Sequence, residues 1–413
     1  MCIRDSAWTA FSWGGRRDYF LIRKLMAFTN LSELEKNGAV LTRRGVSRGK
    51  TNRVRQPHIL DMPIVESDDD IDDQFKFLNA KSLEINDDPF THESDSVDMS
   101  AFALPQLIVK QSWQKQTSRF KCLIVQSTPE LGAVFCNRSY FSIHVTQDSE
   151  KLVEQIWASI NSSLAVYFLL LTSGRLASWI PEPNKIDFLN IPIAVRGNKV
   201  SAETVDDIDR KISDDFQLKD SESVLISDLF RFTMPDFKGN ESSPGRQLTE
   251  RNETAQRLAT REPELSQYCE YFLRVLKSGS GDDFSIHATI FQDSPEQRLP
   301  VRLVAIYLEL DRGDEITIET IESDELCVLL NRLDETYLQI HGQDRGGIFF
   351  QRAARVYMEQ EINGVLTPVI YIVKPDRVRY WTRSAGLRDA DEVAADAQTW
   401  QQANPLSYDE AEA

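Results

Sequence analysis

The stretch PQLIVKQSWQKQTSRFKCLIVQ, residues 105–126, decides the fold class of this chain. It contains two short runs of apolar and β-branched residues, at positions 107–109 and 120–125, with a polar stretch between them. Two similar runs follow at 133–136 and 141–145, between Ser, Thr, Pro and Gly residues. Short β-rich runs bounded by turn-forming residues are typical of strands. We therefore predict a small twisted sheet in this part of the chain.

The residues after the last run predict one long helix. Ser149 is a suitable N-cap, and the segment from there to about Thr172 carries apolar residues at helical spacing. These residues are Leu152, Ile156, Ile160, Leu164 and Phe168. Ser173 and Gly174 should end the helix, and prolines at 181, 183 and 192 indicate an extended return.

A second group of strand-like runs lies in the C-terminal part, after two short predicted helices at 202–212 and 223–232. The predicted strands are residues 284–291, 301–310, 315–321, 347–358, 368–373 and 378–381, and helices are predicted at 324–339 and 387–400. The fold class predicted from these patterns is α+β. It combines a small twisted-sheet domain that carries a long helix with a second mixed, mainly antiparallel α+β domain.

Changes in composition predict where the domains begin and end. The first residues, MCIRDS, look like translated sequencing-adapter sequence, so residues 1–26 are predicted to be an artefact or the remnant of an upstream part. Residues 27–100 are polar and become acidic towards their end, which predicts a loosely structured connector with one short helix at 31–36. The remaining predicted ranges are the sheet domain at 101–196, a helical extension at 197–237, a linker at 238–262, the C-terminal domain at 263–400 and a flexible tail at 401–413.

The net charge of −17 argues at first sight against a nucleic-acid partner, because phosphate binding depends on Lys and Arg. The charges are unevenly distributed, however. One stretch is basic, while acidic runs follow it at 68–73 and 87–88. The basic residues are Arg43, Arg44, Arg48, Lys50, Arg53 and Arg55. Since local fields steer a polyanion more than the total charge does, DNA stays open as a partner.

Cysteine and histidine usage excludes several kinds of site. The five cysteines are scattered without a CxxC or His-paired spacing, which indicates neither a zinc site nor a disulfide framework and fits a reducing cytoplasm. None of the five histidines stands near a Ser or Cys motif, so we predict no catalytic residues and no metal ligands. The longest apolar run, 164–171, is shorter than the roughly 20 residues of a membrane helix. The predicted location is cytoplasmic, with no membrane role.

Several motifs occur in an order that resembles a known family. They are PQLIVKQSWQ (105–114) with RFK (119–121), FCNRSY (135–140) leading to His144, INSSLAVY (160–167), TSGR (172–175) and the Pro-rich return to IPI (191–193). Together they resemble the target-recognition region of adenine-specific (N6) DNA methyltransferases of type I and type IIG restriction-modification or phage-defence systems. The resemblance covers roughly a quarter of the chain.

The resemblance implies a DNA-recognition module whose catalytic half is missing. The Gly-rich turn that would hold S-adenosylmethionine and the Asn/Asp-Pro-Pro-aromatic turn that would grip a flipped adenine are not found in this sequence. S-adenosylmethionine is therefore expected in the missing upstream half, and no cofactor or methyl transfer is expected for this chain alone. The implied partners are double-stranded DNA and the methyltransferase catalytic domain.

The residue types within these motifs fit contact with DNA. Cations on strands and turns can meet phosphates, and here they are Lys110, Arg119, Lys121 and Arg138. Short or bidentate hydrogen-bonding side chains suit base edges, and here they are Gln111, Ser112, Gln114, Asn137 and Ser139. Trp113 and Tyr140 either stack on DNA or belong to the core. Arg175 completes the predicted set through the resemblance, whereas Asn161 and Ser162 are expected to tie the helix to the sheet.

Two other functions stay open from the sequence alone, a restriction endonuclease with a divergent C-terminal active site and a partner-docking protein of the same system. The tetrapeptide PDFK at 235–238 suggests a nuclease, but no second carboxylate and lysine pair follows it on a strand. The C-terminal part also holds cations and aromatic residues that form either a second DNA surface or parts of the fold. They are Arg345, Arg352, Arg355, Lys374, Arg377, Arg379, Tyr380, Trp381, Arg383 and Arg388.

Overall fold

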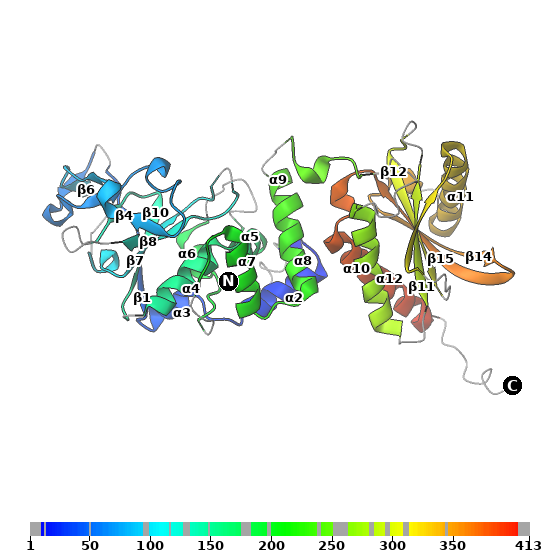
Figure 1. Cartoon of the computed structure of the whole chain (residues 1–413), viewed down its shortest axis with the longest axis horizontal. Coiled ribbons are helices and arrows are strands. Elements are labelled where there is room, and N and C mark those ends of the chain that lie inside the picture. Colours follow the sequence, from blue (N-terminus) through cyan, green and yellow to red (C-terminus); the bar gives the residue numbers. More distant parts are fainter. Residues whose placement is uncertain are drawn as a thin grey trace. The chain divides into compact units, whose positions relative to one another are not determined.

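The computed structural model describes residues 10–11, 14–48, 51–93, 99–114, 117–126, 133–147, 149–174, 183–195, 200–237, 241–250, 263–280, 285–293, 298–308, 314–342 and 346–403. Helices and several mixed or antiparallel sheets make up the described chain, which confirms the predicted α+β class (Figure 1). The chain divides into two compact units, Met1–Ile226 (unit 1) and Ser227–Ala413 (unit 2).

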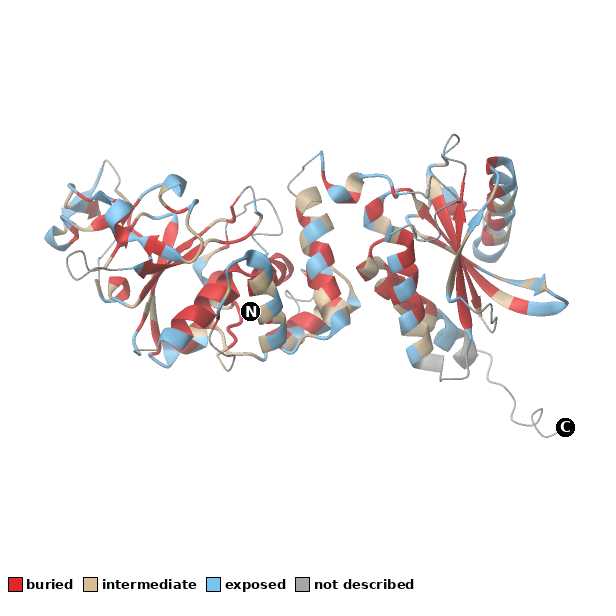
Figure 2. Ribbon diagram, in the orientation of Figure 1, coloured by how far each residue is buried: buried red, intermediate tan, exposed pale blue. Residues whose placement is uncertain are grey.

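Unit 1 is built on a five-stranded sheet with the order β1-β10-β7-β8-β4. Its strands are β1 (Val40–Arg44), β4 (Phe77–Asn79), β7 (Gln106–Lys110), β8 (Cys122–Gln126) and β10 (Tyr140–Val145). Within this sheet β4 runs parallel to β8, and the other pairs are antiparallel. Every residue of β7 is buried, because other elements cover both faces of the sheet (Figure 2). The strands predicted near 107–109, 120–125 and 141–145 are confirmed.

Two smaller sheets arise mainly from the segment predicted as a connector. β3 (Pro63–Val65) pairs with β5 (Glu84–Ile85) and with β9 (Phe135–Cys136), and β2 (Arg53–Arg55) pairs with β6 (Phe90–His92). Short 3-10 helices link these strands, at Pro57–Ile59, Asp68–Asp70, Ala80–Ser82 and Met99–Phe102. The predicted short helix is confirmed as α3 (Leu31–Lys36).

The prediction of a loosely structured connector over 27–100 is therefore wrong. Ile64, Val65 and Leu78 share one core with Ile108 and Leu123 of the main sheet. Each apolar run of the segment is only two or three residues long, which is too short to suggest a strand on its own. These runs are buried because they pair with strands that come much later in the chain.

α4 packs against the face of the main sheet opposite to this core, where it contacts β7 and β8, and the other helices of unit 1 apart from α3 contact α4 or α5 or lie farther from the sheet. The helices are α2 (Arg16–Leu25), α4 (Glu150–Asn161), α5 (Ser163–Thr172), α6 (Lys185–Leu189), α7 (Val205–Asp215) and α8 (Asp220–Asp228). The single helix predicted over 149–172 is in fact two, α4 and α5, bent by 62° at Ser162. Ser162 has an extended backbone, and its hydroxyl accepts a hydrogen bond from the Ala165 amide at 3.3 Å, so it caps α5. Apolar spacing continues through Ser162, so periodicity could not reveal the break.

Residues 16–25, predicted to be an artefact or remnant, form part of the unit 1 core. Leu21, Ile22 and Leu25 of α2 are buried, and the buried Asp18 accepts a hydrogen bond from the Tyr167 hydroxyl of α5 at 2.9 Å. The hexapeptide at 1–6 lies outside the described residues. No single described helix is long and apolar enough to cross a membrane, and α4 and α5 meet that length and composition only as a bent pair.

Unit 2 is a five-stranded sheet with helices on both faces (Figures 1 and 2). The sheet order is β13 (Ile316–Thr320), β11 (Ile286–Gln292), β12 (Val301–Leu308), β15 (Val365–Pro375) and β14 (Ala354–Ile362). Of its pairs, β11 with β13 is parallel and the rest are antiparallel. α10 (Pro263–Ser280) and α12 (Arg383–Ala403) pack on one face, and α11 (Ser323–His341) packs on the other.

Two predictions for the C-terminal part are corrected. Residues 378–381, predicted as a strand, contain a 3-10 helix at Val378–Tyr380, because Trp381 is buried and its indole donates to the Pro375 carbonyl at 3.1 Å. Unit 2 begins at Ser227 and not after a linker at 238–262. A π-helical turn at Leu229–Thr233, α9 (Met234–Phe237) and a 3-10 helix at Pro244–Arg246 follow α8.

Part of the predicted linker is packed into unit 2. The Thr249 hydroxyl donates to Asp376 and accepts from Arg302, each at 2.7 Å, and all three residues are buried. Polar composition suggested a linker because these hydrogen bonds, rather than apolar side chains, hold the segment in place. Residues 238–240 and 251–262 lie outside the described residues.

Candidate nucleic-acid interface

Lys110 and Tyr140, two predicted contact residues, are direct neighbours on adjacent strands of the main sheet. Both side chains meet the carboxylate of Asp68. The Lys110 ammonium donates to one oxygen at 2.5 Å, and the Tyr140 hydroxyl donates to the other at 3.2 Å. The Lys110 side chain is only 10% exposed. Burial and the Asp68 carboxylate raise the pKa of Tyr140 well above its usual range.

Gln114 and Lys121 contact the next part of the same acidic segment. The Gln114 amide donates to the Asp72 carboxylate at 2.7 Å, and the Lys121 ammonium donates to the Asp72 backbone carbonyl at 3.3 Å. Burial lowers the pKa of Lys121, and the charges of Asp72 and Asp73 oppose that shift. Four predicted contact residues thus face one run of carboxylates.

Arg119 and Gln111 lie on the helical side of the main sheet instead. Arg119 makes a bidentate ion pair with Asp209 of α7, at 2.9 and 2.6 Å, and donates to the Asn161 carbonyl at 3.2 Å. The buried Gln111 amide donates to the Pro183 carbonyl at 3.3 Å. The predicted residues are therefore divided between two faces of the sheet and do not form one surface.

The turn between β9 and β10 holds the exposed members of the predicted set. Asn137 donates to the Glu66 carbonyl and accepts from the Ser139 amide, so its side chain shapes the turn. Arg138 and Ser139 are exposed beside it. Ser112 is partly buried and Trp113 is buried, whereas Arg175 lies outside the described residues.

Arg44, an arginine from early in the chain, lies next to this turn. β1 pairs with β10, and the Arg44 guanidinium donates to the Arg138 carbonyl at 2.9 Å. At Gly45 the chain passes directly against the backbone of residues 136 and 137. A methyl group added there would overlap the carbonyl oxygens of Cys136 and Asn137. Arg44, Arg55 and Arg138 are exposed and Arg43 is partly buried. We call these four residues the arginine surface.

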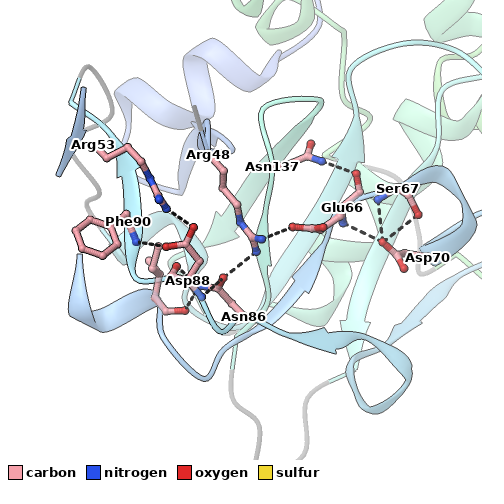
Figure 3. A network of polar contacts seen from close by, with 10 residues as sticks. Arg48, Arg53, Glu66, Ser67, Asp70, Asn86, Asp88, Phe90 and Asn137 are labelled. Carbon is pink, nitrogen blue, oxygen red and sulfur yellow. Dashed lines mark hydrogen bonds and ion pairs between the residues drawn. The ribbon is translucent and has the colours of Figure 1, made fainter. Parts of the chain in front are cut away.

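A polar network fastens this region to the rest of unit 1 (Figure 3). The Arg48 guanidinium forms an ion pair with the Glu66 carboxylate at 2.6 Å and donates a hydrogen bond to the Asn86 side-chain oxygen at 2.8 Å. On the β2–β6 ribbon, Arg53 pairs with Asp88 and lies 4.9 Å from the centre of the Phe90 ring. The β6 end is held by a hydrogen bond from the His92 amide to the Ser47 carbonyl at 3.0 Å. The ribbon is therefore anchored directly after the arginines of β1.

The predicted site set contained Arg138 but did not contain Arg43, Arg44 or Arg55. All three belong to the basic stretch 43–55, which begins at the end of β1 and is visible in the sequence. It could not be placed, because the strand pairing that brings Arg44 to Arg138 joins positions about 100 residues apart in the sequence.

Asn161 has the structural role expected from the sequence. Its side chain exchanges two hydrogen bonds with the Cys122 backbone, accepting at 3.1 Å and donating at 3.0 Å. A third hydrogen bond runs to the Trp157 carbonyl at 2.7 Å. The prediction that Asn161 ties the helix to the sheet is confirmed.

Many cations of the C-terminal face are engaged within unit 2. Lys374 is buried against Asp389, Arg355 pairs with Glu392, and Arg383 pairs with Asp228 at 2.6 Å. Arg379 pairs with Asp236 at 3.0 Å, and Trp381 is buried in the core. Arg345 lies outside the described residues. The contacts of these residues make them parts of the fold, which leaves unit 1 as the better candidate interface.

Among the described residues, no group of three or more His, Cys, Asp or Glu side chains is arranged to hold a metal ion. The chain matches no protein-family model and no curated protein at a significant level.

Proposed function

We propose that this chain binds double-stranded DNA and selects the target sequence for an adenine-specific (N6) DNA methyltransferase of a restriction-modification or phage-defence system. The observation that carries the proposal is the arginine surface. Arg44 and Arg138 lie together at the β1 edge of the main sheet, Arg43 precedes Arg44 on the same strand, and Arg55 is exposed on the β2–β6 ribbon, in a chain whose net charge is −17. The order of the sequence motifs supplies the link to methyltransferases.

Arginine is suited to this role because its guanidinium binds phosphate oxygens in a bidentate way and stays charged at any physiological pH. An acidic protein can bind DNA when its cations are concentrated on the contact surface, since the charge within about one Debye length dominates at cellular salt. The phosphate contacts in this proposal come mainly from the arginine surface. Lys110, Arg119 and Lys121 are held by carboxylates or carbonyl groups of unit 1.

Two features next to the arginine surface can supply sequence selectivity. Ser139 is exposed beside Arg138 and offers a short hydroxyl to a base edge. The β2–β6 ribbon presents Val54 and Phe90, which are 44% and 36% exposed, between arginines. A two-stranded ribbon fits the major groove, where apolar side chains contact the thymine methyl group.

In this proposal, methyl transfer belongs to a catalytic domain outside this sequence. That domain would hold S-adenosylmethionine and the flipped adenine, and this chain would determine where on the DNA the domain acts. We expect target recognition to take place in the cytoplasm, where the cell's DNA and S-adenosylmethionine are both present.

The proposal is tested by selecting binders for the full chain from a library of duplexes with a randomised centre. We expect one recurrent sequence to be enriched and to bind about 10³-fold more tightly than random duplex, near the lower limit for specific recognition. Arg138→Ala should weaken binding to selected and random duplexes alike. Absence of both enrichment and low-salt binding would contradict the proposal.

A further inference from the structure

We propose that residues 66–73, the acidic segment, cover a second row of DNA-contacting side chains and compete with DNA for them. The row consists of Lys110, Gln114, Lys121 and Tyr140. This inference rests on the proposed DNA-binding function and adds a form of regulation to it. When DNA displaces the segment, its phosphates take over the ion pair and hydrogen bonds that carboxylates of the segment make with the row in the free protein.

The composition of the acidic segment suits such competition. Six of its eight residues are Asp or Glu, so its charge density approaches that of a nucleic-acid strand. Asp68 binds Lys110 and Tyr140 together, and Asp72 binds Gln114. An ammonium and two neutral donors are a combination that a phosphate oxygen also accepts. The carboxylates therefore occupy positions that DNA phosphates could take.

Lys110 needs a negatively charged partner both when the acidic segment is in place and when it is displaced. Its side chain is 10% exposed, and a buried ammonium without a partner is strongly unfavourable. The side chain of Asp68 is 53% exposed, so solvent and salt weaken its hold on Lys110. The cation is thus buried and the anion is replaceable. This asymmetry favours exchange of Asp68 for an incoming phosphate.

Apart from the covered row, the acidic segment is held by polar contacts of Glu66, whose carboxylate pairs with Arg48 at 2.6 Å and whose carbonyl accepts from Asn137. Ile71 is its buried apolar side chain, and the remaining described contacts are largely polar. Asp70 accepts hydrogen bonds from the amides of Glu66 and Ser67, each at 2.9 Å, which keeps the turn itself together. Displacement therefore costs the burial of one isoleucine and several salt-sensitive contacts, and it leaves the local turn intact.

The experiment measures duplex affinity of the full chain by fluorescence anisotropy for two matched double variants. Asp68→Asn/Asp72→Asn removes the two carboxylates that contact the covered row. Glu84→Gln/Asp87→Asn removes the same charge from exposed residues of unit 1 that lie outside the acidic segment and make no described side-chain contact with the row. Lys110→Gln/Lys121→Gln is then added to each background, and thermal unfolding checks that all variants fold.

We expect Asp68→Asn/Asp72→Asn to bind about three- to tenfold more tightly than Glu84→Gln/Asp87→Asn, with a salt slope larger by one to two units. Adding Lys110→Gln/Lys121→Gln should abolish that difference. Equal affinities of the two double variants, or a gain that survives removal of both lysines, would overturn the inference while leaving DNA binding intact. Failure of every protein to bind duplex at low salt would instead reject the proposed function.

Hydrogen exchange on the wild-type chain tests the same inference without substitutions. Saturating duplex should increase amide exchange in residues 66–73 and decrease it in β1 and the turn around Arg138. Protection of the acidic segment by DNA would contradict displacement even if a variant failed to fold.

Discussion

At the scale of single residues, unit 1 depends on one close approach of two backbones. Gly45 lies against the carbonyl oxygens of Cys136 and Asn137, and there is no space for a side chain. We expect Gly45→Ala to destabilise unit 1 by about 1–3 kcal/mol, because the strands must separate to admit a methyl group. Gly174→Ala is the matched control, since a methyl group there meets nothing within 4 Å. The measurement is urea-dependent labelling of the buried thiol of Cys122 in the full chain. Equal labelling midpoints for the two variants would show that the approach is not tight.

Protonation of a tyrosine gives unit 2 a pH-dependent stability. Partial desolvation and the Asp396 hydrogen bond raise the pKa of Tyr357, which is 38% exposed, above its usual value of 10.0. Above pH 10 the unfolded chain therefore loses a proton that the folded chain keeps, so stability falls as pH rises. Lys374 acts in the opposite sense, because burial lowers its pKa below 10.5. Tyr357→Phe should flatten the fall between pH 9.5 and 11 and leave the slope near pH 8 unchanged. Urea-dependent labelling of the buried Cys269 thiol reports unit 2, and an unchanged alkaline slope would contradict the assignment.

At the scale of elements, α12 is fastened to its sheet by a buried ion pair. Lys374 of β15 pairs with Asp389 of α12, which also accepts from the Tyr268 hydroxyl of α10 at 2.6 Å. We expect Asp389→Ala to cost about 3–5 kcal/mol, because it leaves the buried Lys374 cation without its counter-charge, and only the Tyr380 carbonyl still accepts a hydrogen bond from it among the described contacts. The double variant Lys374→Met/Asp389→Leu should recover most of that loss. Glu270→Ala, in an exposed pair with Arg274, is the control and should cost at most about 1 kcal/mol. Additive costs in the Lys374–Asp389 cycle, read from Cys269 labelling, would show that the pair is not coupled.

Elements were predictable from the sequence where their patterns were long and local. The apolar run at 107–109 and the helical spacing of 324–339 correspond to β7 and α11. Prediction failed for elements whose structure depends on partners far away in the sequence. β3 has three residues and becomes a strand through β9, about 70 positions later. The sequence did not predict the break at Ser162, because apolar residues keep their helical spacing on both sides of it. The break is marked by the extended backbone of Ser162 and by its hydroxyl, which caps α5.

At the scale of the whole molecule, the candidate site shows the same limit more clearly. Residue type alone suggested Lys110 and Arg119 as phosphate contacts, but Asp68 and Asp209 hold them within unit 1. Arg44 and Arg55 were visible in the sequence only as members of a basic run. Their neighbours depend on sheet register, which a single sequence does not specify. The total charge was equally uninformative, because a net charge of −17 describes neither where carboxylates gather nor which cations they neutralise.

The salt dependence of duplex binding tests the central claim most directly. Each phosphate contact contributes about 0.9 to the slope of log affinity against log salt. Arg44→Ala/Arg55→Ala/Arg138→Ala should therefore lower the slope by about 2 to 3 units. The matched control Arg16→Ala/Arg23→Ala/Arg210→Ala removes the same charge from α2 and α7 and should leave the slope within about half a unit of the wild type. A slope unchanged by the first variant, or lowered equally by both, would contradict DNA binding through the arginine surface.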